Sequence, residues 1–175
     1  MSEFDPNNAI QFNLPEGSLR TREGTKVVLL SAEALGEFIS AAGPQGGVRL
    51  LRTIGDTLGK EALASIPGAF DEATLAEVIG HLAGWLRVGG WGRLSFERWG
   101  DALVIDFVST TVNARAAERL LEGMIARASG RPVACAYVEG SRFLLLSEST
   151  AKEVRTWARS GLRLGEIVSR LEGTE

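Results

Sequence analysis

The sequence has 175 residues, and 45% of them are hydrophobic, which is enough to bury the core of one compact domain. Lys and Arg total 19 against 22 Asp and Glu, so the net charge is −3, and the two signs are mixed along the chain. This pattern argues against nucleic acid and anionic membranes as partners, because both require a basic surface.

The chain contains a single cysteine, Cys135. One cysteine excludes an internal disulfide and any zinc site built from several cysteines, and it is compatible with a reducing compartment. The first residues carry neither a basic region nor an apolar run. The longest apolar stretches elsewhere are far shorter than the roughly 18 to 20 residues that span a bilayer. We therefore expect a cytoplasmic protein without a membrane-inserted segment.

The N-terminal residues 1–24 are polar and rich in turn formers, which predicts an N-terminal arm that is ordered only in part. A short strand is expected over residues 26–30. Ser31 is a good N-cap for a first helix that extends through Ala42 and ends at Gly43-Pro44.

A second helix is expected to begin at Gly46 or Gly47 and to stop before Pro67. Gly55 and Gly59 lie one turn apart on one face of it, and each costs about 1 kcal/mol in helix propensity relative to Ala. Two interpretations remain open: a close crossing with another element, or glycines that a glycine-rich chain tolerates.

Between Asp71 and Val108 the spacing of the apolar residues changes from the repeat of a helix to the alternation of strands. Asp71 is expected to cap a third helix, which Gly89 and Gly90 end. In residues 91–97 and 102–108 apolar residues then recur with the period of strands. This pattern predicts a hairpin with its turn at Trp99-Gly100-Asp101.

A fourth helix is expected between the N-cap Asn113 and Gly130, and residues 133–138 and 142–147 predict a second hairpin around Gly140. Two consecutive units of helix and hairpin indicate an α+β fold. We expect a twisted antiparallel sheet of about four to five strands with helices packed on one face, formed by residues 25–148.

Residues 149–175 predict one last helix with a narrow apolar stripe between charged flanks. Its apolar positions and one glycine are spaced alternately by three and four: Val154, Trp157, Gly161, Leu164, Val168 and Leu171. Such a stripe packs either on its own domain or on a partner. We predict an interface, with Trp157 at its centre, because tryptophan is over-represented at such positions.

Residues that could perform chemistry are sparse. The only histidine, His81, lies beside the apolar stripe of its predicted helix and is interpreted as a rim residue rather than a catalytic base. One histidine and one distant cysteine form no recognisable metal site. The Gly43-Pro-Gln-Gly-Gly run lacks the phosphate-loop pattern. We expect no cofactor, no metal and no catalysis, with an enzyme that uses His81 as an alternative.

Four stretches, residues 26–35, 50–59, 89–97 and 120–134, together resemble the 4-vinyl reductase domain and its relatives among the small subunits of the TRAPP vesicle-tethering complex. The resemblance covers residues 26–148. It implies helices on one face of a twisted antiparallel sheet, a homodimer, and either an apolar cavity for an aromatic or acyl ligand or a scaffold surface for other proteins. The cavity would be lined from helices two, three and four by Ile54, Leu58, Leu82, Trp85, Leu121 and Met124.

Residues 50–55, 90–92 and 120–123 also look like an accessory protein of the bacterial cellulose synthase complex. That resemblance implies an alternative function, a ring-forming protein without enzymatic activity that guides polysaccharide export. The leading prediction is a non-catalytic scaffold or binding module for a small apolar ligand. It would act through protein–protein contacts, favour a homodimer, and bind neither nucleic acid nor membrane.

Overall fold

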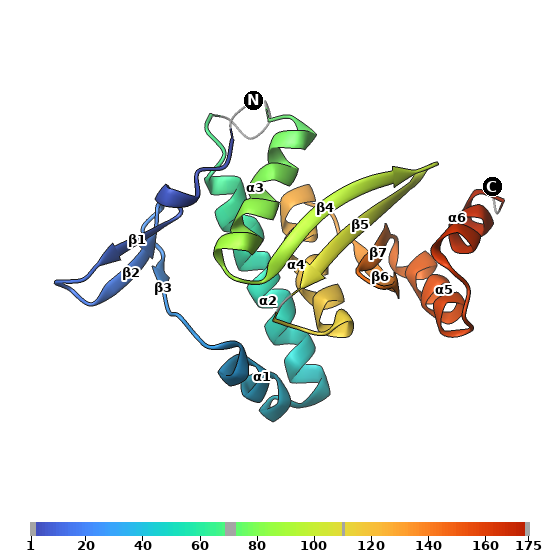
Figure 1. Ribbon diagram of the computed structural model, residues 1–175, viewed down its shortest axis with the longest axis horizontal. Helices are drawn as coiled ribbons and strands as arrows, with labels where there is room; N and C mark the ends of the chain where they lie inside the picture. Colours follow the sequence, from blue (N-terminus) through green and yellow to red (C-terminus); the bar gives the residue numbers. More distant parts are fainter. Residues whose placement is uncertain (1–2, 69–72, 110, 174–175) are drawn as a thin grey trace.

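The computed structural model describes residues 3–68, 73–109 and 111–173. Figure 1 shows the elements in chain order, which are η1 (Pro6–Asn8), β1 (Ile10–Asn13), β2 (Ser18–Thr21), β3 (Lys26–Val27), α1 (Ala32–Ala41), α2 (Gly43–Ala64), α3 (Leu75–Val88), β4 (Gly92–Trp99), β5 (Ala102–Ser109), α4 (Ala114–Ser129), β6 (Ala134–Glu139), β7 (Arg142–Leu146), α5 (Glu148–Arg159) and α6 (Leu164–Glu172).

The main sheet has four antiparallel strands in the order β4-β5-β7-β6, so the two predicted hairpins lie side by side. Both turns contain a glycine with positive φ, Gly100 and Gly140, a conformation that favours glycine. The hairpins and the α+β class are confirmed.

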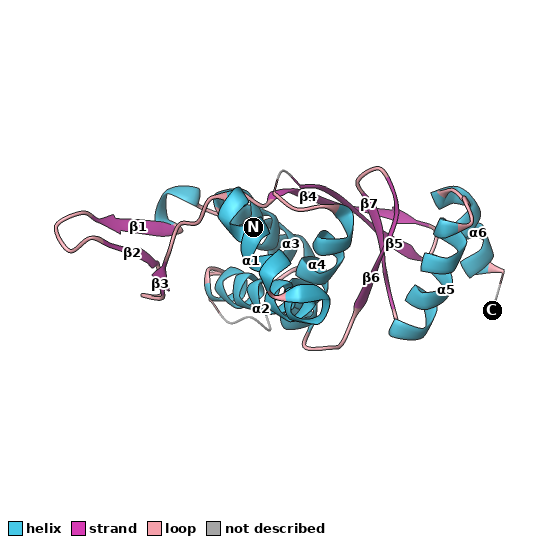
Figure 2. Ribbon diagram, turned by 90° about the horizontal axis from the view of Figure 1, so that it is seen from below, coloured by secondary structure: helices cyan, strands magenta, loops and turns pink. Residues whose placement is uncertain are grey.

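Both faces of the main sheet are apolar over β5, β7 and β6, whereas Arg93, Ser95 and Glu97 of β4 are exposed on its outer face. On one face, Ile105 lies beside Phe143 in the register of β5 and β7, while Val104 and Leu144 alternate to the other face. A sheet with two apolar faces requires cover on both sides. The predicted single helical layer corresponds to α2, α3 and α4, and the structure places α5 and α6 on the opposite face (Figure 2).

The crossing of α2 and α4 settles the role of the glycine pair. A Cβ atom at Gly55 would clash with the carbonyl oxygen of Leu120, and one at Gly59 with that of Met124. Gly123 on α4 meets the backbone of Arg52 in the same way. Glycine at these positions lets the two helices approach to backbone contact, so the close-crossing interpretation is correct.

We define the N-terminal segment as residues 3–42. Its first part, which was predicted to be an arm ordered only in part, is more ordered than predicted. β1, β2 and β3 form a small antiparallel sheet that projects from the rest of the chain (Figure 1), and β3 is shorter than the expected strand. The segment is docked by a few side chains, with the Phe4 ring packed edge-on against His81 and over Gly84, and with Ala9 buried.

Three predicted helix boundaries change. α2 begins at Gly43 rather than at Gly46 or Gly47, directly after the end of α1. The N-cap of α3 is Thr74, whose side chain forms a capping box with Glu77, while Asp71 lies outside the described residues. The single C-terminal helix is wrong: α5 ends at Arg159, and Gly161 has a φ of +92° in the turn before α6. The glycine in the apolar stripe is therefore a helix break rather than a close-packing position.

Among the described residues, no helix is both long enough and apolar enough to cross a bilayer.

Candidate functional site

An apolar cleft of about 540 Å³ lies between the N-terminal segment and the body, which we define as residues 43–68, 73–109 and 111–173. Its floor is made by α2 and the end of α3, and its rim by the chain between β3 and α1. The large apolar side chains that line it are Ile10, Val27, Val28, Leu29, Leu30, Leu35, Ile54, Leu58, Trp85, Val88 and Trp91.

Three of the six predicted cavity residues, Ile54, Leu58 and Trp85, line this cleft. The other three, Leu82, Leu121 and Met124, do not line it, because they are buried in the core between the helices and the sheet. The sequence predicts a cavity between the helices and the strands. The structure places the cleft on the outer side of α2 instead.

Two charged residues line the cleft, the exposed Lys26 and the buried Glu61. Glu61 is only 5% exposed, and its Oε1 accepts a hydrogen bond from the Thr25 hydroxyl at 2.9 Å. Its Oε2 has no hydrogen-bond partner within the described parts of the chain. A buried carboxylate oxygen without a donor is costly. The cleft thus combines a largely apolar wall with one buried carboxylate whose hydrogen bonding is incomplete among the described residues.

His81 is 2% exposed, so the prediction of a rim position is wrong. Its Nδ1 lies 2.7 Å from the Ser65 hydroxyl oxygen, which also lies 2.7 Å from the Ala62 carbonyl oxygen and accepts from Trp85 Nε1 at 3.2 Å. The histidine faces inward because Phe4 of the N-terminal segment covers it. This arrangement holds the ends of α2 and α3 together.

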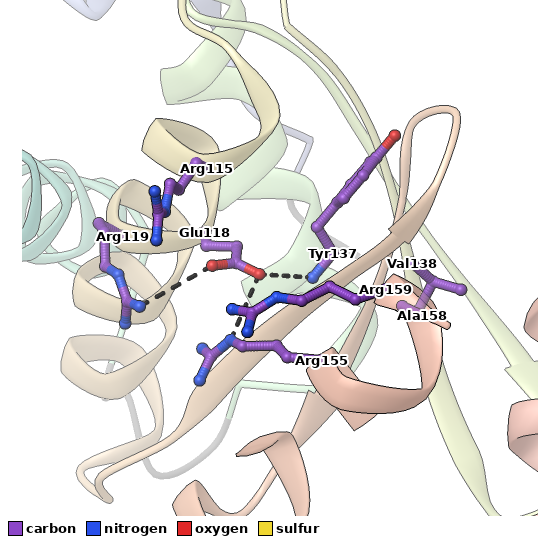
Figure 3. Close-up of a pocket in the computed structure, with 8 residues that line it drawn as sticks. All are labelled: Arg115, Glu118, Arg119, Tyr137, Val138, Arg155, Ala158 and Arg159. Carbon is purple, nitrogen blue, oxygen red and sulfur yellow. Dashed lines mark hydrogen bonds and ion pairs between the residues drawn. The ribbon is translucent and has the colours of Figure 1, made fainter. Parts of the chain in front are cut away.

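A second pocket, the arginine pocket, lies on the other side of the molecule between α4, β6 and α5 (Figure 3). It has a volume of about 550 Å³ and is lined by Arg115, Glu118, Arg119, Tyr137, Val138, Arg155, Ala158 and Arg159. Four guanidinium groups and one carboxylate give its lining a formal charge of +3. This is opposite in sign to the charge of the whole chain.

The inner wall of the arginine pocket is a buried ion cluster around Glu118 and Glu122, which are 5% and 2% exposed. Glu122 Oε2 accepts from Arg52 at 2.7 Å and from Arg119 at 2.6 Å, and its Oε1 accepts from Arg155 at 3.1 Å. Several charge-assisted hydrogen bonds compensate each buried carboxylate.

The same cluster closes the free edge of the sheet. β6 is an edge strand, and its outward N–H groups at Cys135 and Tyr137 donate to Glu122 and Glu118 at 3.3 and 2.7 Å. Arg155 donates to the Cys135 carbonyl at 2.8 Å. Side chains from α4 and α5 therefore take the place of a further strand and block edge-to-edge pairing.

Sequence reasoning missed this cluster. Glu118 and Glu122 are one helical turn apart beside the apolar stripe of α4, which is the one local signal that they face inward. Their partners Arg52 and Arg155 lie in other helices, 70 and 33 residues away from Glu122. Only the packing of those helices brings the charges together.

Cys135 is fully buried in the core. Burial, and next the negative charges of Glu122 and Glu118, raise the pKa of its thiol well above the ordinary range. Such a thiol remains protonated and is a poor nucleophile or metal ligand. In the part of the chain that the structure describes, no group of three or more His, Cys, Asp or Glu residues is placed to hold a metal ion.

The predicted interface residues divide between the two C-terminal helices. Val154, Leu164 and Val168 are buried against the outer face of the sheet. Trp157 and Leu171 are half-buried at the edge of that core, and Arg170 of α6 lies over the Trp157 ring at 5.7 Å. Gly161 is exposed in the turn. An interface role for this set stays a prediction.

No protein-family model matches this chain, and a search of the curated proteins found no match.

Proposed function

We propose that this chain is a non-catalytic binding module that holds a small apolar ligand in the apolar cleft. The observation that carries the proposal is the cleft itself, in which two tryptophans and two aliphatic residues of α2 face an open volume of about 540 Å³. That size lies within the range of small-molecule sites, and the lining has their usual composition. The resemblance to the 4-vinyl reductase domain leads to the same proposal, because its relatives bind aromatic or acyl ligands.

Glu61 narrows the class of ligand. Glu61 belongs to the lining of a largely apolar cleft, and its buried Oε2 has no partner among the described residues, so the favoured ligand has an apolar body and a hydrogen-bond donor or a positive charge at one end. Of the two charged residues in the lining, Lys26 is exposed to solvent and Glu61 is buried, so we expect repulsion from Glu61 to disfavour a ligand that carries a carboxylate.

The cleft can be tested by displacement of the neutral dye Nile red. Val28 and Leu30 are exposed on the rim, so changing both to Ser leaves the fold intact. We expect the double variant to bind the dye about fivefold more weakly for each ~1 kcal/mol of lost apolar contact. Leu75→Ser is the matched control, since Leu75 is exposed on α3 and does not line the cleft. Equal dye binding by all three proteins would contradict the proposal.

The proposed preference for a ligand with a positive charge at one end can be tested with two ligands of equal chain length. Octylamine should displace Nile red at a lower concentration than octanoate, and Glu61→Gln should remove the difference. Native mass spectrometry of the protein purified without organic solvent supplies the complementary observation, a co-purified apolar species.

A scaffold function is the second candidate, and a different observation favours it. Of the eight large apolar side chains that are exposed among the described residues, six belong to the N-terminal segment: Phe12, Leu14, Val28, Leu29, Leu30 and Phe38. Such a concentration is typical of a surface that contacts another protein. We propose a homodimer through this segment. Sedimentation distinguishes it from the ring that the likeness to the cellulose synthase accessory protein implies.

An enzyme that uses His81 is the least supported alternative. The imidazole is buried, and the Ser65 hydroxyl beside it is also within hydrogen-bond distance of a backbone carbonyl. A general base must reach the proton that it removes from a substrate. His81→Gln should change no turnover of the native protein; loss of a turnover with an unchanged fold would overturn the non-catalytic proposal.

A further inference from the structure

We propose that the arginine pocket is a second binding site, separate from the apolar cleft, for a small molecule that carries two or more phosphate groups. Its four arginines come from two facing helices, Arg115 and Arg119 from α4 and Arg155 and Arg159 from α5 (Figure 3). Each pair is spaced by one turn, so both pairs point to the same volume.

The structural role of the ion cluster does not account for all four arginines. Arg119 and Arg155 neutralise Glu118 and Glu122 together with Arg52. Arg115 and Arg159 are exposed at the mouth, and neither has an ion pair or side-chain hydrogen bond with any described residue. Like charges one turn apart destabilise a helix by a few tenths of a kcal/mol. A bound anion would offset that repulsion.

The inner arginines are held in place before any ligand arrives. Arg119 donates through one nitrogen to both oxygens of Glu122, at 2.9 and 2.6 Å. Arg155 is fixed by its hydrogen bonds to Glu122 and to the Cys135 carbonyl. No hydrogen bond from Arg119 Nε or Arg155 Nη1 to the described part of the chain is observed, so both groups retain donors. Preorganised donors bind an anion with little loss of side-chain entropy.

Phosphate fits this arrangement better than carboxylate does. The tetrahedral oxygens of a phosphate group can accept hydrogen bonds from two opposite walls at once, whereas a planar carboxylate accepts best along one edge. A formal charge of +3 in the lining calls for more than one anionic group. The limited size of the pocket between two helices and a strand favours a small molecule, because a nucleic acid would need an extended basic stripe.

The test is isothermal titration of the full chain with inorganic pyrophosphate at low ionic strength. We expect saturable binding at one site that weakens as salt is raised. Arg115→Gln and Arg159→Gln should each weaken it about tenfold, the loss of one charge-assisted contact. Both side chains are exposed, so the variants fold. Arg93→Gln is the control, because Arg93 is an exposed arginine on β4, at the opposite edge of the sheet.

Three results would overturn the proposal. The first is the absence of saturable binding by the native protein at millimolar pyrophosphate. The second is equal weakening by Arg93→Gln and the pocket variants, which would show a diffuse charge effect. The third is equally tight binding of citrate, which would show that the pocket does not select phosphate. Nile red binding in the Arg115→Gln and Arg159→Gln variants should remain native, so failure of this site is distinguishable from failure of the apolar cleft.

Discussion

The body and the N-terminal segment bury their apolar side chains to very different degrees. In the body, most of the sheet is covered on both faces and α2 contacts α4 through backbone atoms. The N-terminal segment is attached by a few side chains, among them Phe4, Ala9 and Leu35, and leaves most of its large apolar residues in solvent. The body therefore holds most of the buried apolar core, and the segment has the surface that a ligand or partner would cover.

The largest effect is expected at Glu122, where the body holds its most buried charge. Glu122→Gln removes the charge that Arg52, Arg119 and Arg155 share. Breaking a buried ion pair from one side costs about 3–5 kcal/mol of unfolding free energy, because uncompensated charges remain. Urea unfolding of the native protein and the variant measures this loss of unfolding free energy.

The control for Glu122 is the exposed pair of Arg98 and Asp101, both more than three-quarters exposed. Asp101→Asn should cost less than about 1 kcal/mol. Similar losses in the two variants would show that the cluster around Glu122 is not the main support of the sheet edge.

The glycine crossing is the next most sensitive feature of the body. Gly55→Ala places a methyl group against the backbone of α4, and relief of the clash requires the helices to separate. We expect a loss of about 3 kcal/mol, at the upper end of overpacking effects. Gly80→Ala on α3 is the control, since it meets open space, and it should raise stability by up to about 1 kcal/mol. Thermal unfolding of both variants decides whether the glycines are required.

Trp157 tests whether the C-terminal helices belong to the body or to an interface. Its ring packs against α6 of its own chain. Trp157→Ala should therefore lower the unfolding free energy by about 2 kcal/mol and leave the mass in solution unchanged. If it instead weakens self-association by about 30-fold without loss of stability, the interface predicted from the sequence is correct.

The smallest effect on stability is expected in the N-terminal segment. Leu29→Ser combined with Leu30→Ser changes two exposed side chains, so the unfolding free energy should move by less than about 0.5 kcal/mol for each. If the segment forms the homodimer, sedimentation of this variant will show a shift toward monomer. If the dimer dissociates no more readily than that of the native protein, the dimer contact lies outside these two residues.

Local sequence signals predicted most of the body. Asn113 caps α4, and glycines terminate α4 and turn both hairpins, as each residue's own conformational preferences require. The alternation of apolar residues in β5 predicted a strand, and the structure shows that both of its faces are buried. Such signals depend only on residues close together in the sequence, so the sequence alone is sufficient to predict these caps, turns and strands.

The candidate sites depended on the tertiary structure. Glu122 and Arg155 look like ordinary charges of two amphipathic helices until α4 and α5 meet at the edge of β6. Likewise, Gly161 fits an apolar stripe by spacing but has a positive φ that ends a helix. The sequence by itself determined the order of the elements from α1 to β7 and the α+β class, but neither the strands β1 and β2 nor the break between α5 and α6. The tertiary structure decided where the cleft lies and which charges are buried, because those depend on contacts between residues far apart in the chain.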